Sequence, residues 1–325
     1  MTPVVETRGL VKRYDGQLAV AGVDLVVGPG EIFGLVGPNG AGKTTMMKIL
    51  ATLLAPTAGE ALVTGIPVTA DPLEVRRRIG YMPDFYGVYD DLRVWEYLDF
   101  FARCYGVPAS RRVVMIGELL EIVGLAEKRN DYVESMSRGM RQRLCLAHTL
   151  VHDPALLILD EPASGLDPRA RVEMREILRE LRAMGKTVLV SSHILPELGE
   201  MCTGVGIIDH GRLLRAGSID EIERSLRATA VLRIDILGDE AAAGAAREWL
   251  RSDPRVGDVM TDGEAGASAT RLEVAFDGLP EAQAELLRTM VESGHRVVGF
   301  SQATSDLEEI FLKVTGQQPD EEAAA

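Results

Sequence analysis

The chain has few of the features that characterise secreted or membrane-spanning proteins. Its 325 residues include three cysteines, Cys104, Cys145 and Cys202, which are scattered and lack the spacing of metal ligands. So few thiols favour a reducing compartment over a disulfide-stabilised fold. No apolar run approaches the roughly 20 residues that cross a bilayer, and no signal peptide precedes the first expected strand. We therefore expect a chain that does not itself span a membrane.

Basic residues are also scarce. The sequence holds 35 lysines and arginines against 49 aspartates and glutamates, a formal net charge of −14. This balance argues against nucleic acid as a major partner, because phosphate backbones bind basic surfaces. The excess of acid is concentrated in residues 228–325, which contain 8 basic and 19 acidic residues and so carry −11. This shift in composition predicts a domain boundary near residue 227.

Aromatic residues number 16, and half of them lie between residues 85 and 105. The eight are Phe85, Tyr86, Tyr89, Trp95, Tyr97, Phe100, Phe101 and Tyr105. A loop followed by a helix over Val94–Tyr105 is expected here. The rings either form the core of a helical subdomain, which suits Trp95, Phe100 and Phe101, or anchor a partner. Tyr86 and Tyr89, in the loop, are the better candidates for such a contact.

What the chain does contain is a glycine-rich loop of nine residues. It consists of Gly37, Pro38, Asn39, Gly40, Ala41, Gly42, Lys43, Thr44 and Thr45. The loop follows an apolar run that predicts a strand and precedes a helical pattern, which is the context of a phosphate-binding loop. The glycines let successive N–H groups turn towards an anion. Lys43 is expected to reach the β- and γ-phosphates, and the Thr44 hydroxyl to bind Mg²⁺.

Asp160 and Glu161 directly follow a second apolar run, Leu156–Leu159. Such a run is typical of a central strand in a parallel sheet, and the carboxyl ends of these strands form the ligand edge of open α/β sheets. Asp160 is expected to hold Mg²⁺ through water. Glu161 is expected to orient and deprotonate an attacking water, a role that contributes about 10²- to 10⁴-fold in rate. Acidic pairs often end strands, so this assignment depends on the nearby phosphate loop.

The segment Met136–Arg143 has the sequence Met-Ser-Arg-Gly-Met-Arg-Gln-Arg. It resembles the signature of the ATP-binding subunits of ABC transporters, which is Leu-Ser-Gly-Gly-Gln followed by a basic-Gln-basic helix. In that family the signature of one subunit closes over the ATP on the phosphate loop of another, so the resemblance implies a dimer around two ATP molecules. Ser137 is a favourable N-cap, Gly139 allows close backbone approach, and the helix dipole points at the γ-phosphate.

Further motifs of the family occur in the expected order over residues 4–217. The resemblance implies that Tyr14 stacks on adenine. It also implies that Ser164–Asp167 is the loop that crosses between subunits, with Asp167 near the nucleotide. His193, after a third apolar strand, matches the histidine that contacts the γ-phosphate. Lys43, Glu161 and His193 are therefore the expected catalytic residues.

The chain departs from the family pattern at two positions. Asp84 stands where the family usually has a glutamine that touches Mg²⁺. An aspartate is shorter and charged, so we expect it to bind Mg²⁺ through water and to make nucleotide affinity more metal-dependent. The alternative is a tolerated surface aspartate. Arg138 replaces a signature glycine, and its guanidinium either points to solvent or adds charge opposite the triphosphate.

These motifs predict an α/β fold in which residues 1–227 form a P-loop NTPase domain of the ABC type. A helical subdomain is expected at approximately residues 85–152. In the resembling family this subdomain forms a groove for a short helix of the membrane subunit, which implies docking near Tyr86 and Tyr89.

Residues 228–316 are expected to form a small α+β accessory domain, and residues 317–325 to be disordered. Strand patterns occur at Ala230–Leu237, Arg271–Phe276 and Arg296–Phe300, and a helical pattern at Pro280–Ser293. A last helix is predicted at Ser305–Val314, which begins with a capping box. Tails ending in a similar Leu-Glu-Glu-Ile-Phe run occur in polysaccharide, drug and ABC-2-type exporters, so the resemblance implies an exporter.

Two conspicuous patterns have structural explanations. His148 and His152 are four residues apart on the helix after the signature, but no third ligand lies nearby in sequence, so we do not expect a metal site. Leu178, Leu181 and Met184 are expected to form the buried stripe of the helix that follows the inter-subunit loop.

The sequence thus predicts an ATPase that binds ATP and Mg²⁺, dimerises, and drives a separate transmembrane permease from the cytoplasmic face of the cell membrane. Two alternatives remain: a non-transport relative that acts on ribosomes or DNA, and a regulator that senses ATP without turnover. The single phosphate loop and the acidic composition disfavour the first. A measurement of ATPase activity tests the second alternative, because such a regulator would not hydrolyse ATP. The transported substrate is not identified, because it would contact the membrane subunit.

Overall fold

The structure is a computed structural model that describes residues 2–85, 87–219, 221–222, 230–264, 269–278 and 280–302. Its contacts divide the chain into two compact units, Met1–Ile219 and Asp220–Ala325. The boundary expected at residues 227–228 falls among residues 223–229, outside the described part. In that part, no helix combines the length and apolarity that a membrane span requires.

The first unit contains an antiparallel sheet with the order β2-β1-β4-β5. Its strands are β1 (Val5–Tyr14), β2 (Gln17–Val27), β4 (Ala58–Val63) and β5 (Ile66–Pro67). β1 and β2 form a hairpin whose two turn residues, Asp15 and Gly16, both have positive φ. That geometry matches the twist of a two-residue hairpin, and it places Tyr14 at the end of β1 beside the turn.

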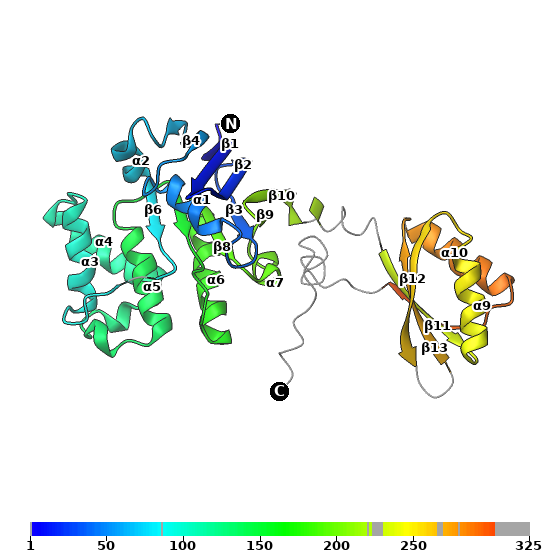
Figure 1. The fold of residues 1–325 in the computed structure, drawn as a ribbon. Helices are drawn as coiled ribbons and strands as arrows, with labels where there is room; N and C mark the ends of the chain where they lie inside the picture. The colour runs from blue at the N-terminus through cyan, green and yellow to red at the C-terminus, as the bar shows by residue number, and fades with distance from the viewer. Residues whose placement is uncertain are drawn as a thin grey trace. The chain divides into compact units, whose positions relative to one another are not determined.

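A six-stranded sheet forms the centre of this unit, with the order β10-β9-β3-β8-β7-β6 (Figure 1). Its strands are β3 (Ile32–Val36), β6 (Ile79–Met82), β7 (Leu156–Leu159), β8 (Thr187–Ser192), β9 (Gly204–Asp209) and β10 (Arg212–Ser218). The strands from β9 to β6 run parallel, and β10 pairs antiparallel with β9. Every residue of β3, β7 and β8 is buried, as apolar runs in a covered parallel sheet require.

Seven α-helices are described in the first unit. They are α1 (Lys43–Leu50), α2 (Pro72–Arg78), α3 (Val94–Cys104), α4 (Ala109–Ile122), α5 (Arg138–Thr149), α6 (Pro168–Ala183) and α7 (Leu195–Gly199). Short 3₁₀ turns occur at Ala126–Lys128 and Val133–Ser135. Helices α3, α4 and α5 pack on one another beside β6, and so form a helical subdomain (Figure 1).

The buried stripe expected on α6 is partly wrong. Leu178 and Leu181 are buried, but Met184 is 55% exposed. Met184 is the C-cap of α6 and lies beyond its last helical residue, so the helical period no longer directs its side chain to the core.

The aromatic residues of α3 are shared between the core and the surface. Tyr97 is fully buried, whereas Phe100 is 43% exposed. Phe101 stacks on the imidazole of His148 at 4.3 Å between ring centroids. His152 stacks on Tyr105 in the same way. The expectation that both histidines lie on one helix is wrong, because α5 ends at Thr149 and His152 lies in the turn that follows.

The packing of His148 predicts a pH dependence of stability. Burial, with a smaller effect of His152, lowers its pKa from 6.5 to about 4. The unfolded chain therefore binds a proton between these values that the folded chain does not, so stability is full above pH 6.5 and falls as pH drops towards 4. The loss is about 3 kcal/mol of unfolding free energy from this group. Urea unfolding at pH 7 and pH 4 measures it, and His148→Gln should reduce the difference. An equal pH dependence in both proteins would contradict the assignment.

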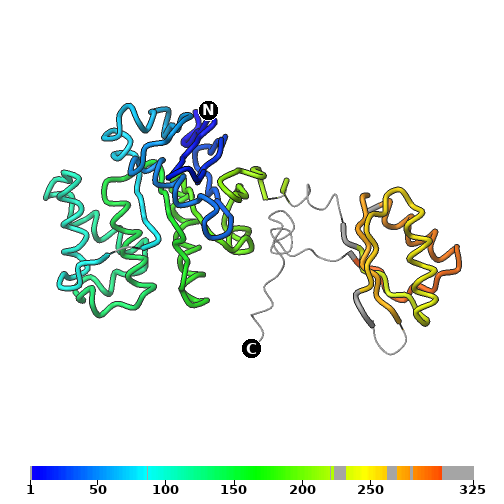
Figure 2. Tube along the Cα trace, viewed as in Figure 1, coloured from blue at the N-terminus to red at the C-terminus, as the bar shows by residue number. Residues whose placement is uncertain are grey.

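The second unit is a four-stranded antiparallel sheet with the order β12-β13-β11-β14, covered by two helices (Figure 2). Along the chain its elements are β11 (Ala230–Leu237), α9 (Glu240–Leu250), β12 (Val256–Glu264), β13 (Ala269–Phe276), α10 (Pro280–Glu292) and β14 (Val297–Gln302). This β-α-β-β-α-β order is that of a ferredoxin-like fold. Residues of both helices share one buried cluster with β11 and β13, so α9 and α10 cover the same face.

The α+β character expected of this unit is confirmed, with β11 at its predicted bounds and α10 and β13 within one or two residues of theirs. Helix α9 and strand β12 were not predicted from the sequence. The α9 segment has few large apolar side chains, but Asp239 accepts a hydrogen bond from the N–H of Ala242 and so caps α9. The helix predicted at Ser305–Val314 and the tail at residues 317–325 lie outside the described residues.

Candidate active site

The parallel strands bring the chemically important residues to one edge of the central sheet. The phosphate loop follows β3, Asp84 follows β6, the Asp160–Glu161 pair follows β7, and His193 follows β8. The carboxyl ends of parallel strands meet at the same edge, where open α/β sheets bind ligands. Residues that are far apart in the sequence therefore lie in one site.

The loop between β3 and α1 is shaped as an anion cradle. Gly40 and Gly42 have φ values of 83° and 108°, a region that favours glycine. Gly42 is also the N-cap of α1, so the free N–H groups of the first helical turn face the loop. Gly37 does not share the unusual backbone angle that we expected of it; a side chain there would collide with the backbone oxygen of Ile208.

Lys43 is the first residue of α1, and its side chain is buried within the loop. Its Nζ donates to the carbonyl oxygens of Gly37 and Pro38 at 2.5 and 3.3 Å. It also lies 3.5 Å from Oε1 of Glu161. The ammonium group thus joins the phosphate loop to the acidic pair, and its charge offsets that of Glu161.

Asp160 is buried at the end of β7, where a serine of the next strand holds it. Oγ of Ser191 donates to Oδ1 of Asp160 at 2.7 Å and accepts the N–H of Glu161 at 2.9 Å. Burial raises the pKa of the Asp160 carboxyl; the Ser191 and Thr44 hydroxyls oppose that shift, and the charges of Asp84 and Glu161 add to it. Among the described residues, Oδ2 of Asp160 has no hydrogen-bond partner.

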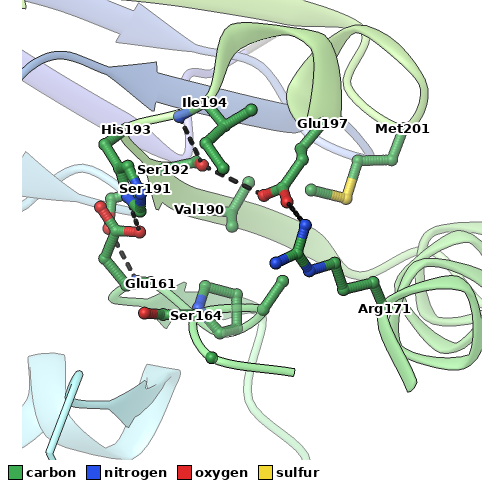
Figure 3. A pocket seen from close by; sticks show the side chains of 13 residues that line it. Glu161, Ser164, Arg171, Val190, Ser191, Ser192, His193, Ile194, Glu197 and Met201 are labelled. Atoms are coloured by element: carbon green, nitrogen blue, oxygen red, sulfur yellow. Dashed lines mark hydrogen bonds and ion pairs between the residues drawn. The ribbon is translucent and has the colours of Figure 1, made fainter. Parts of the chain in front are cut away.

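Glu161 has a strained backbone, with φ at 49°, a value that is uncommon outside glycine. Its Oε2 lies 2.9 Å from Nδ1 of His193 (Figure 3). The carboxylate therefore lies between the Lys43 ammonium and the imidazole. The side chain of His193 is half exposed.

Two further candidates are exposed beside this site. Tyr14 is 44% exposed, and the ammonium of Lys12 lies 5.2 Å from the centre of its ring. The neighbouring strand β2 touches the phosphate loop, because a side chain at Gly42 would meet the backbone oxygen of Ala19. Asp84 is exposed in the loop after β6 and lies close enough to Asp160 to affect its pKa.

The signature segment is separate from the phosphate loop within one chain. Ser137 is the N-cap of α5 and accepts the N–H of Met140 at 3.3 Å. Asp167 caps α6 in the same manner, by accepting the N–H of Ala170 at 2.9 Å. In the described part of the chain, no hydrogen bond or ion pair connects Ser137, Arg138 or Gly139 with the phosphate loop. Arg138 instead donates to the backbone oxygen of Ser164 at 3.1 Å.

A polar chain connects the strand that precedes His193 with the loop before α6. The Ser192 hydroxyl donates to Glu197 at 3.4 Å, and Glu197 pairs with Arg171 at 2.9 Å (Figure 3). Nε of Arg171 donates to the backbone oxygen of Leu166 at 3.1 Å. The histidine loop and the Ser164–Asp167 loop are thus linked through side chains of α6 and α7.

Comparison with known proteins identifies the family. The family described as "ABC transporter" matches residues 20–164. The chain is 39% identical over 320 residues to the daunorubicin/doxorubicin resistance ATP-binding protein DrrA of Streptomyces peucetius, which covers 98% of this chain and 94% of that protein. This chain belongs to the ABC transporter ATP-binding proteins. It is also 35% identical over 318 residues to Nod factor export ATP-binding protein I of Cupriavidus metallidurans, covering 98% and 99% of the two chains.

A solved structure described as the ATP-binding subunit of an ABC transporter is 31% identical, with a TM-score of 0.62. The match covers 68% of this chain and 92% of that one. The predicted family and the α/β P-loop ATPase fold are therefore confirmed. ABC ATP-binding subunits bind and hydrolyse ATP, dimerise and work with a transmembrane partner, and this chain is an ATPase of that type.

In this ABC ATP-binding protein, Ser191 bonds to both members of the acidic pair, a role that was not predicted from the sequence. Its position follows from strand register, since Leu159 pairs with Val190 and the next residues along are Asp160 and Ser191. Two adjacent serines before a histidine were the only signal, and they do not reveal register. The pair Arg171 and Glu197 was also missed, because its members belong to different helices.

Proposed function

We propose that the chain is the ATP-hydrolysing motor subunit of a membrane exporter, located on the cytoplasmic face of the cell membrane. The position of Glu161 between Lys43 and His193, at the ligand edge of the sheet, is the observation that carries the hydrolytic part. The exporter part is supported by two relatives that match nearly the whole chain, a drug-resistance and a Nod factor export ATP-binding protein.

In the proposed mechanism, water attacks the γ-phosphorus of ATP in line with the leaving ADP oxygen. Glu161 orients this water and accepts its proton. Lys43 exchanges its bonds to the loop carbonyls for bonds to β- and γ-phosphate oxygens, so its charge follows the developing negative charge. His193 holds Glu161 through Nδ1 and directs its other ring nitrogen to the γ-phosphate. Tyr14 stacks on adenine.

The residues present fit a Mg²⁺ ion. Asp160 offers a buried carboxylate oxygen without a hydrogen-bond partner among the described residues, and the Thr44 hydroxyl lies close to it. Such oxygen donors, with waters and phosphates, are what Mg²⁺ prefers. When bound, the ion would neutralise charge between the β- and γ-phosphates. Thr44 and Asp160 would hold it, with Asp84 acting through water.

Replacing Asp84 with glutamine should change the metal dependence of ATP binding. The aspartate repels the triphosphate unless Mg²⁺ screens it, whereas glutamine does not. We expect Asp84→Gln to strengthen ATP binding about tenfold in EDTA; the effect is no larger because Asp84 is exposed and partly screened by water. In excess Mg²⁺ the affinity should be nearly unchanged, because the ion screens the aspartate. Titration of ATP by calorimetry in both conditions measures this. If the ratio of the ATP affinity in Mg²⁺ to that in EDTA were the same in the parent and the variant, a metal role for Asp84 would be contradicted.

The proposed dimer explains why the signature segment is separate from the phosphate loop of its own chain. Ser137 and Asp167 are exposed and each begins a helix, which supports their contact with an ATP held by a second copy. Gly139 lies in the first turn of α5, where its free N–H adds to the same anion site. Two copies would thus enclose two ATP molecules and separate after hydrolysis.

The transmembrane subunit is proposed to dock on a groove lined by Val88, Tyr89, Asp90, Asp91, Leu92 and Phe100. Tyr89 is 54% exposed and packs edge-on against Phe100, with 5.6 Å between ring centroids. Half-exposed aromatics are common anchors at interfaces. The two aspartates in the rim favour a partner helix that carries basic residues. Tyr86, the second residue expected at this contact, lies outside the described residues.

Co-expression with the membrane protein encoded beside this chain tests the exporter role. We expect the two proteins to co-purify, and the ATPase activity to rise when the complex is in lipid. Tyr89→Ala should weaken assembly about 10- to 30-fold, as loss of a central aromatic anchor does. Tyr105→Ala is the matched control, since Tyr105 is 45% exposed on the same helical subdomain but outside the groove. Equal weakening by both variants, or none by Tyr89→Ala, would rule out this docking site.

A further inference from the structure

The loop before α6 is held by three side chains of its own protomer through alternate carbonyl oxygens. Gln142 donates to Pro162, Arg138 donates to Ser164, and Arg171 donates to Leu166. Gln142 and Arg138 both belong to α5, the helix that begins at the signature. The loop is therefore attached to the signature helix at its start and at its middle, and to α6 at its end.

The Arg138 side chain also packs against the loop. Its guanidinium occupies the space beside Gly165 that a side chain at that position would need, and an added Cβ would overlap it. Gly165 has φ at 66°, so glycine is favoured there by its backbone as well. A planar guanidinium can lie flat on such a bare turn while one N–H bonds the neighbouring carbonyl, which an ammonium group cannot do equally well.

The contact between Arg138 and the loop depends on the arginine that stands in place of a signature glycine. A glycine at position 138 has no side chain, so neither the bond to Ser164 nor the packing on Gly165 could form. Arg138 remains exposed, and it lines a surface cavity together with Asp84 and Arg141. The bond to Ser164 was not among the two arrangements expected from the sequence, in which the guanidinium points to solvent or faces the triphosphate.

We propose that Arg138 is a positioning residue that fixes the Ser164–Asp167 loop against the start of α5. This inference rests on the proposed function, in which both segments meet the ATP of a second copy. Ser137 at the N-terminus of α5 and Asp167 at the N-terminus of α6 then approach that ATP as one preformed surface. Pre-organisation of this kind strengthens association by removing the cost of ordering the loop on binding.

The first test is made on the nucleotide-free protein and does not depend on dimerisation. The amides of Ser164 and Leu166 donate within the loop, to Glu161 and Ala163. In Arg138→Gly their hydrogen exchange should be about three- to tenfold faster, the size expected for loss of one partly exposed charge-assisted bond. Arg138→Lys should fall between the two proteins. The matched control is Arg169→Ala, which removes an arginine that is 90% exposed on the nearby first turn of α6. Unchanged exchange in Arg138→Gly would overturn the proposal.

The second test uses the Glu161→Gln background, in which ATP should trap the dimer. Arg138→Gly should raise the dimer dissociation constant about three- to tenfold, while the affinity of each protomer for ATP stays unchanged. Gly165→Ala should weaken the dimer by a similar factor in the arginine background and by less in the Arg138→Gly background, because the overlap with the guanidinium is then absent. Equal effects of Gly165→Ala in both backgrounds, or full dimerisation of Arg138→Gly, would overturn the positioning role. Failure of Glu161→Gln itself to dimerise with ATP would instead refute the proposed dimer, whatever the exchange data show.

Discussion

Replacing Glu161 with glutamine is expected to lower ATP turnover by about 10²- to 10⁴-fold while ATP still binds. The side chain keeps its size, so its place between Lys43 and His193 is retained. A neutral amide, however, cannot accept the proton of the attacking water. Phosphate release and ATP binding measured on the same preparation separate the two effects. The variant should also accumulate an ATP-bound dimer, which size-exclusion chromatography with light scattering detects.

The matched control is Glu176→Gln, which alters an exposed glutamate on α6 that pairs with Arg179. Its turnover should equal that of the parent. If Glu161→Gln retains a third or more of the parent activity, Glu161 is not the general base. If it loses ATP binding as well, the substitution has disturbed the Lys43 contact, and Glu161 would then be assigned to binding.

The elements of the first unit that carry the site could be predicted because their signals are local. The apolar runs at β3, β7 and β8 are short and uninterrupted, and each is followed directly by the residues that carry the chemistry. One helix start was also visible in the sequence, since Ser137 was expected to cap α5 and does so. Such features depend on a few adjacent residues, which a sequence displays completely.

The contacts that order the site could not be predicted in the same way. Ser191 reaches Asp160 because β7 and β8 pair in one particular register. Arg138 reaches Ser164 because α5 packs against the loop before α6. Both depend on how elements distant in the sequence are placed, and a one-residue slip in register would turn Ser191 to the other face of the sheet.

The second unit shows where local patterns are insufficient. Helix α9 contains five alanines and only two large apolar residues, Trp249 and Leu250, so its apolar face is built mainly of small side chains. That face is nonetheless buried, since Ala246 and Leu250 pack into one cluster with Ile234 of β11. Small side chains suffice because the helix lies close to the sheet, and this closeness is a property of the assembled unit.

Lys43→Ala is expected to weaken ATP binding about 30- to 5,000-fold, the range found when one partner of a buried, hydrogen-bonded charge pair is removed. The Lys43 ammonium is buried, bonded to two loop carbonyls and near Glu161. Without it, the phosphates would face those carbonyl oxygens and an unpaired carboxylate, and both repel an anion.

Lys48→Ala is the control, because Lys48 lies exposed in the last turn of the same helix and its loss should leave ATP affinity unchanged. Lys43→Arg should also bind ATP weakly, since the longer, planar guanidinium does not fit the space bounded by the Gly37 and Pro38 carbonyls. Calorimetric titration of all three variants with Mg-ATP provides the comparison. An affinity of Lys43→Ala within fivefold of the parent would mean that the loop binds the triphosphate through its backbone alone, and that Lys43 serves mainly to balance Glu161.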